Sequence, residues 1–133
     1  NPELLIPALD EGVTVIAAHG GSSGLFVLER NLPVLLGMMA RYPNLYADVS
    51  AMTLPNRVRA LFQLARHPEV FDRLLFGTDY PIPVFAYPCL AAFSLSGYLA
   101  ARSAPSRFDR QARVIREVGI TLTRDFLDLT RGS

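Results

Sequence analysis

The sequence predicts an α/β fold in which short parallel strands alternate with helices. Three segments, residues 13–18, 44–50 and 73–77, read as strands, and the first is continuously apolar, as in a strand buried on both faces. Helical patterns stand before, between and after these strands. An order of this kind favours parallel strands joined by crossover helices.

Caps and apolar spacing predict the helices. Residues 1–12 read as one helix that begins with Asn1 as its N-cap and ends at Gly12. A second helix is predicted over residues 31–42, and apolar side chains recur at helical spacing between residues 58 and 65. Two further helical stretches are expected at residues 108–118 and 122–129.

The length and composition are those of one domain, or of part of one, with enough apolar residues to bury a core. Half of the residues are hydrophobic, and the formal net charge of +1 comes without a basic block, so no nucleic-acid partner is expected. The single cysteine, Cys89, cannot form an internal disulfide and is expected to serve in packing. This usage fits a reducing cytoplasm.

One uncharged run, residues 80–101, is as long as a membrane span. It contains three prolines together with two serines and a glycine, and prolines at this density break a spanning helix. We therefore expect a loop that leads into a buried helix, and no association with a membrane.

Three polar residues stand near the ends of the predicted strands. They are His19, Asp48 and Asp79, separated by 29 and then by 31 positions. A (β/α)8 barrel of about 250 residues divides into units of about 31 residues, and such barrels build their active sites at the carboxyl ends of the strands. An open doubly wound sheet also binds ligands at that edge, so the spacing by itself leaves both architectures open.

The motifs around these three residues resemble a known family. The segments "VIAAHGG", "NLYADVS" and "RLLFGTDYPIP" are similar to strands six, seven and eight of the amidohydrolase-related family (amidohydrolase 2), a group of metal-dependent TIM-barrel enzymes. The resemblance covers about residues 1–90, and "FGTDYP" is its most specific part. It implies that residues 1–133 are the carboxyl-terminal portion, about strands six to eight, of one amidohydrolase-type barrel domain.

The resemblance also implies that other parts of the site lie elsewhere. The family supplies a His-x-His pair from strand one and a further histidine from strand five, whereas this sequence contains only His19 and His67. About five strand–helix units of such a barrel, including the N-terminal strands, are therefore expected to be absent. A catalytic zinc site needs about three protein ligands, so this chain alone is expected to be inactive and to hold no tight metal.

Asp79 and His19 are the predicted catalytic residues. The family's matching aspartate ligates the metal and helps to activate its water, so the resemblance makes Asp79 the metal ligand; as an ordinary residue it would be a helix N-cap or a solvated turn aspartate. The family's matching histidine lies beside the metal and contacts the reacting water or the substrate. His19 could therefore act as an acid, a base or an electrostatic stabiliser, and its alternative is a hydrogen-bonded core histidine.

The neighbouring residues are given supporting roles. Gly20 and Gly21 let backbone and substrate approach closely, so they are predicted to contact the substrate. Asp48 is expected to fix the strand ends or the neighbouring loops rather than to react. His67, in a predicted loop before a proline, is expected at the surface.

The predicted activity is that of a cytoplasmic, metal-dependent hydrolase of the amidohydrolase superfamily. It would act on a small substrate, expected to carry a carboxylate, through a metal-activated water, with zinc as the first choice of metal and manganese or magnesium as alternatives. Non-hydrolytic decarboxylation in the same pocket is a second interpretation, and a flavodoxin-like binding domain without catalysis is a third. The expected partners are the small substrate and either a second copy of the chain or an N-terminal segment, because the first strand leaves an open edge.

Overall fold

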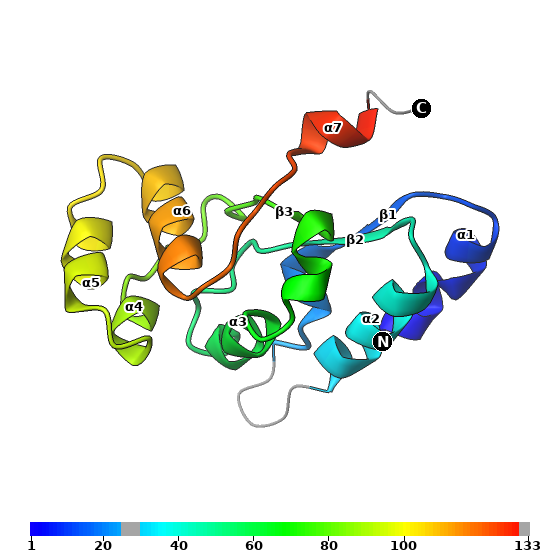
Figure 1. Ribbon diagram of the computed structural model, residues 1–133, viewed down its shortest axis with the longest axis horizontal. Coiled ribbons are helices and arrows are strands. Elements are labelled where there is room, and N and C mark those ends of the chain that lie inside the picture. Colours follow the sequence, from blue (N-terminus) through cyan, green and yellow to red (C-terminus); the bar gives the residue numbers. More distant parts are fainter. Residues whose placement is uncertain (25–29, 131–133) are drawn as a thin grey trace.

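The computed structural model describes residues 1–24 and 30–130, and a small parallel sheet runs through its middle (Figure 1). The sheet contains strands β1 (Val15–Ala17), β2 (Leu45–Asp48) and β3 (Leu74–Leu75), in that spatial order. Both neighbouring pairs are parallel, with Ala17 opposite Ala47 and Asp48 opposite Leu75. The predicted parallel arrangement of successive strands is confirmed.

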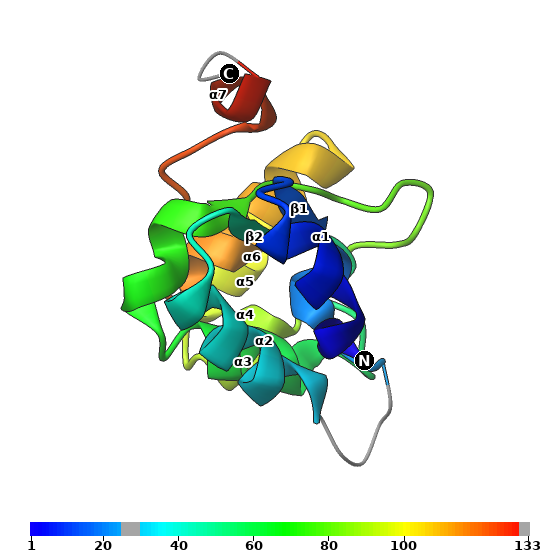
Figure 2. The same ribbon diagram turned by 90° about the vertical axis from the view of Figure 1, so that its right-hand side faces the viewer.

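Helices precede, connect and follow the strands. Their bounds are η1 (Pro2–Leu5), α1 (Ile6–Asp10), η2 (Ala18–Gly21), α2 (Asn31–Arg41), α3 (Val58–Leu64), η3 (Pro68–Arg73), α4 (Pro88–Ala91), α5 (Leu95–Arg102), α6 (Arg107–Glu117) and α7 (Phe126–Thr130), where η marks a 3-10 helix. Helices α4, α5 and α6 form a group at one end of the molecule, and α1 and α2 lie at the other (Figure 1). Helix α7 stands apart from the rest at the end of an extended segment (Figures 1 and 2).

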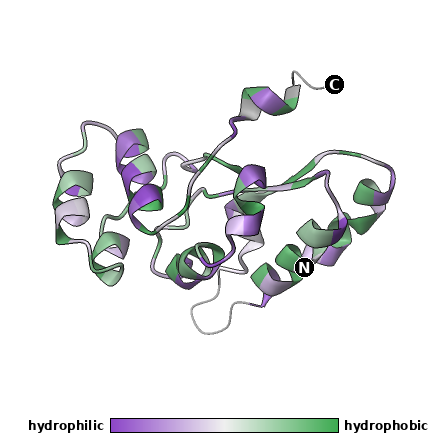
Figure 3. Cartoon of the chain, viewed as in Figure 1, coloured by the Kyte–Doolittle hydropathy of each residue, from purple (hydrophilic) through white to green (hydrophobic). Residues whose placement is uncertain are grey.

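The core lies between the sheet and the helices that cover it. Leu45, Ala47 and Leu74 of the strands are fully buried, as are apolar side chains of α2 and α3. Burying a leucine of this kind contributes roughly 1.5–3 kcal/mol relative to leaving it exposed. Hydrophobic residues accordingly concentrate on the strands and the inner faces of the helices, with polar residues on α6 and η3 (Figure 3).

Several predicted elements are shorter or more divided than the sequence indicated. The strand expected over residues 13–18 is reduced to β1, because the chain turns into η2 directly after Ala17. The single helix expected over residues 1–12 is a 3-10 turn followed by α1. Pro7 lacks the N–H that would continue one helical ladder, and it stands in the first turn of α1.

The uncharged run at residues 80–101 is a loop followed by two short helices. The loop leads to α4, whose Pro88 and Cys89 are buried, as the sequence predicted. The chain then turns at Phe93, and the Ser94 side chain accepts a hydrogen bond from the Gly97 N–H (3.1 Å) to start α5. No helix in residues 1–24 or 30–130 has the length and apolar character needed to cross a membrane.

Candidate functional site

The carboxyl edge of the sheet gathers the three polar residues that end the predicted strands. His19 lies in η2 directly after β1, Asp48 is the last residue of β2, and Asp79 follows β3. Because the strands are parallel neighbours, their carboxyl ends meet at one edge. The structure therefore brings His19, Asp48 and Asp79 together, as expected from their spacing.

The Asp48 carboxylate ties two strand ends to each other. Its Oδ1 accepts hydrogen bonds from the His19 N–H (2.8 Å), the Ser50 N–H (3.0 Å) and the Ser50 hydroxyl (2.5 Å). Hydrogen bonds to an ionised acceptor are shorter and stronger than those between neutral groups. Asp48 thus fixes the backbone at His19 against the loop that follows β2, which is the kind of position that the sequence suggested for it.

The His19 ring is oriented by Ser50. Its Nδ1 lies 2.8 Å from the Ser50 hydroxyl oxygen and 3.2 Å from the Ser50 carbonyl oxygen. A carbonyl can only accept, and the Ser50 hydroxyl donates its hydrogen to Asp48, so the Nδ1 atom must carry a proton and donate. In the neutral ring, Nε2 then has its lone pair available for a metal or for a proton.

Asp79 faces the available nitrogen of His19. The distance from His19 Nε2 to Asp79 Oδ2 is 3.7 Å, and the two side chains are 25% and 41% exposed. This separation is too long for a hydrogen bond. Two ligands of one zinc ion, each at about 2.1 Å, lie roughly 3.4 Å apart at the tetrahedral angle, so the pair has a spacing close to that of two such ligands.

The donor atoms suit a metal in kind but not in number. Imidazole nitrogen and carboxylate oxygen are both zinc ligands, and a catalytic zinc site uses three protein ligands. Within the described part of the chain, no group of three or more histidine, cysteine, aspartate or glutamate residues is placed to hold a metal ion. His19 and Asp79 can therefore supply two donors of a site whose remaining donors this part of the chain does not offer.

The backbone at this edge adopts conformations that side chains other than glycine rarely take. The φ angles are 56° at His19, 52° at Ala51 and 59° at Asp79. A residue in this left-handed region costs about 1–3 kcal/mol unless its surroundings hold it there, and such residues cluster at functional sites. Here the two facing side chains, His19 and Asp79, both project from a strained backbone.

Comparison with known families identifies the chain. A family model described as Amidohydrolase (Amidohydro_2) matches residues 5–112, a range that includes His19, Asp48 and Asp79. The chain belongs to the amidohydrolase family. No curated protein and no solved structure matched it.

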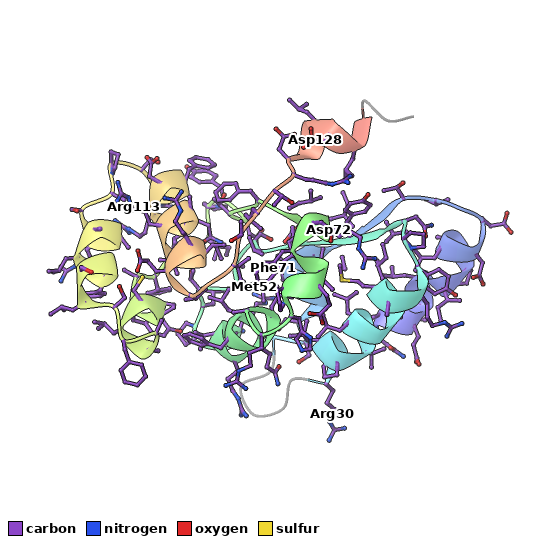
Figure 4. The ribbon with its side chains drawn as sticks, in the orientation of Figure 1. Arg30, Met52, Phe71, Asp72, Arg113 and Asp128 are labelled. Carbon is purple, nitrogen blue, oxygen red and sulfur yellow. The ribbon has the colours of Figure 1, made fainter. Side chains whose placement is uncertain are left out.

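The two glycines after His19 pack against the core of this amidohydrolase chain. A Cβ at Gly20 would lie 3.1 Å from Met52 Cε, and a Cβ at Gly21 would lie 3.0 Å from Leu35 Cδ2. Met52 is fully buried in the middle of the molecule (Figure 4). Both glycines also have positive φ angles, of 59° and 64°, so a side chain at either position would be strained as well as crowded.

Gly21 additionally lines a cavity of about 300 Å3 beside β1. The cavity also includes Ile16, Ala17 and Ala18, so it opens along the first strand of the sheet. The predicted contact of Gly20 and Gly21 with a substrate stays a prediction, and the packing just described gives both glycines a structural reason to be there.

His67 and Cys89 lie away from the carboxyl edge. The Nδ1 of His67 is 2.7 Å from Glu69 Oε1, the His67 side chain is 41% exposed, and this hydrogen bond lowers the pKa of Glu69. Cys89 is a free, buried thiol, and burial raises its pKa, so it stays protonated within the core. These positions agree with the surface and packing roles that the sequence predicted for them.

Two residues of the site were not found by sequence reasoning. Ser50 stands two positions after Asp48. In extended backbone this spacing puts both side chains on one face, and it could have indicated that Ser50 belongs to the site. Gln111 is a fully buried polar residue on α6, and its amide reaches the loops that follow β2 and β3. The sequence could have indicated Gln111 because it is a polar residue on the same helix face as Val114 and Ile115.

Proposed function

We propose that this chain is the carboxyl-terminal part of a metal-dependent (β/α)8-barrel hydrolase. One observation carries the proposal: in a member of the amidohydrolase family, His19 Nε2 and Asp79 Oδ2 face each other at 3.7 Å on the carboxyl edge of a parallel sheet. Enzymes built as (β/α)8 barrels carry their catalytic side chains at this edge.

The order of the strands supports the barrel over a flavodoxin-like domain. Strands that follow one another in the chain are also neighbours in space, in the order β1-β2-β3. A barrel has this sequential order, whereas a flavodoxin-like sheet begins in the order 2-1-3. In the whole enzyme, N-terminal strands outside this sequence would pair with the open edge of β1 and would bring the remaining metal ligands; a second copy of the chain is the alternative occupant of that edge.

In the whole enzyme Asp79 would hold a divalent metal, zinc first and manganese or magnesium as alternatives. When bound, the metal acts as a Lewis acid and makes its water a nucleophile at neutral pH. The Asp79 carboxylate would accept the proton that the water loses.

His19 would act on the substrate from beside Asp79. Ser50 keeps the Nδ1 proton engaged, so Nε2 is the atom that exchanges a proton at the site. With Nε2 protonated, His19 donates to the oxygen on which negative charge develops and later supplies the proton that the leaving group needs. The substrate is a small molecule with a carboxylate, and its C–N or C–O bond is cleaved in the cytoplasm.

A decarboxylase is the second candidate, because the same pair of residues serves it. A proton donor on His19 Nε2 would then protonate the carbon that loses carbon dioxide, and no water would be consumed. Product analysis separates the two reactions. Release of carbon dioxide without cleavage of a C–N or C–O bond assigns the decarboxylase, and cleavage without carbon dioxide assigns the hydrolase.

Zinc titration of the 133-residue chain beside the full-length protein tests the division of the site between segments. With Asp79 as its one assigned metal ligand and at most the neutral form of His19 beside it, the chain alone should bind zinc weakly, and the full-length protein should bind about one equivalent tightly. Calorimetry measures both. Tight, stoichiometric binding by the monomeric 133-residue chain would show that the site is complete here and would contradict the proposal.

A further inference from the structure

Helix α6 reaches the site through one buried amide. The Gln111 side chain is completely buried, and its Nε2 donates to the carbonyl oxygens of Val49 (2.8 Å) and Gly77 (3.3 Å). Val49 directly follows Asp48, and Gly77 lies two residues before Asp79. Gln111 therefore joins the loop that follows Asp48 to the loop that carries Asp79.

Apolar packing of the helix face does not account for a glutamine at this position. The neighbouring buried positions of α6 hold Val114 and Ile115, as a helix face against a core requires. Because a carbonyl oxygen can only accept, the Nε2 end of the Gln111 amide must face the two carbonyls. The Gln111 Oε1 is then buried with no hydrogen-bond partner. An unpaired buried acceptor costs about 1–3 kcal/mol; an apolar side chain would avoid that cost but would leave the Val49 and Gly77 carbonyls without this donor.

We propose that Gln111 is a positioning residue that sets the spacing of His19 and Asp79. On one side, Val49 lies between Asp48 and Ser50, the two residues that hold the His19 backbone and ring. On the other side, Gly77 leads through one residue to Asp79. By holding both carbonyls, one amide group fixes the two loops relative to each other.

The two loops touch where Gln111 holds them. A Cβ at Gly77 would lie 3.1 Å from the Cβ of Ser50, so the backbones are as close as a missing side chain allows. A small change in the spacing of the loops would therefore move Ser50, and with it the ring of His19.

Helix α6 also holds the far side of the Asp79 loop. An Arg107 guanidinium nitrogen donates to the Pro81 carbonyl oxygen (2.9 Å), and the Arg107 guanidinium lies over the Tyr80 ring at 5.5 Å. The loop is thus anchored by α6 both before and after Asp79. Gln111 differs from Arg107 in that it also contacts the loop after β2, so its amide adds a direct link between the two loops to the pairing of β2 with β3.

Hydrogen exchange of the full-length protein tests the coupling without any assay of activity. In Gln111→Met, which keeps the length of the side chain and removes the donor, amide exchange in peptides spanning residues 49–54 and 76–82 should rise about tenfold or more. Peptides from α2 should change little. Gln63→Met on α3 is the matched control, because the Gln63 Oε1 is also buried and unpartnered while its side chain lines a cavity with Leu32 and Leu36, away from the site.

Gly77→Ala supplies a second route to the same result. It pushes the loops apart beside Ser50 and leaves Gln111 unchanged, so it should raise exchange in the same two peptides. Unchanged exchange there in both variants, or a rise of equal size in every peptide, would overturn the positioning role. An increase confined to these two peptides excludes a general loss of stability as the cause.

The consequence for catalysis rests on the proposed function. In the metal-loaded full-length enzyme, Gln111→Met should lower kcat about tenfold to a hundredfold with KM changed less than threefold, since the site is misaligned but not removed. Normal kcat in Gln111→Met overturns the role. Normal turnover in Asp79→Asn would instead contradict the proposed function and would leave the exchange result standing.

Discussion

Two regions of the molecule each hold a histidine beside a carboxylate, and only one of them is arranged as a site. His67, between α3 and η3, contacts Glu69 two positions away, and the two side chains are 41% and 64% exposed. His19, at the carboxyl edge, is 25% exposed and meets partners that are far away in the sequence: Asp48, Ser50 and Asp79. A local pair on the surface needs nothing from the fold, whereas the His19 group exists only when three strand ends come together.

The two histidine rings also differ in which groups engage their nitrogen atoms. The Nδ1 of His67 is engaged by an exposed carboxylate, and an exposed pair of this kind contributes little to stability. The Nδ1 of His19 is held by a serine that is itself held by Asp48, and its Nε2 is directed at Asp79. Orientation by a chain of hydrogen bonds is what distinguishes a reactive histidine from a solvated one.

Replacing each histidine by alanine sharpens this comparison and should give its largest effect. In the full-length enzyme, His19→Ala should lower kcat about a hundredfold or more, because a general acid–base group contributes that much. His67→Ala should change kcat less than twofold. Steady-state kinetics on the metal-loaded proteins measures both, and equal losses in the two variants would remove the distinction between the two histidines.

Asp48→Ala should give the next largest effect, on stability and on turnover together. It leaves the His19 and Ser50 N–H groups without their acceptor, which should lower the free energy of unfolding by about 2 kcal/mol or more. The His19 ring loses its orientation at the same time, so kcat should fall about tenfold to a hundredfold. Urea unfolding and kinetics give the two values; Asp48→Asn, which keeps an acceptor oxygen, should lose less of each.

The smallest effect is expected at Glu69, whose pKa is lowered by its hydrogen bond from His67. Because the pKa of Glu69 is lower in the folded state, this pair stabilises the protein above the ordinary glutamate pKa, and the contribution disappears as the pH falls through the lowered value. In His67→Ala the Glu69 pKa should move up towards its ordinary value. Carboxyl carbon chemical shifts followed by NMR over the acid range measure it, and an unchanged Glu69 pKa would show that His67 is not its cause.

The sequence predicted the parts of this molecule that depend on local pattern. The apolar run before His19 and the helical pattern after it indicate a strand, a crossover helix and then a parallel strand. Parallel strands bring His19, Asp48 and Asp79 to one edge, whichever residue each strand begins at. It did not predict that the run over residues 80–101 divides at Phe93, because that turn depends on the Ser94 cap. Gln111 was missed for a different reason: a glutamine on a helix face shows its role only when the carbonyls that it meets, 62 and 34 positions away, are in place.

The most direct test of the central claim, that Asp79 is the metal-binding base beside His19, is the metal content and turnover of the full-length protein carrying Asp79→Asn. Asp72→Asn is the matched control, since Asp72 is an exposed carboxylate on η3, 62% accessible and away from the carboxyl edge (Figure 4). Asp79→Asn should lose most of its bound metal and about a hundredfold or more of its turnover while keeping its fold by circular dichroism, and Asp72→Asn should keep all three. Nearly normal turnover with a normal metal content in Asp79→Asn would contradict the claim.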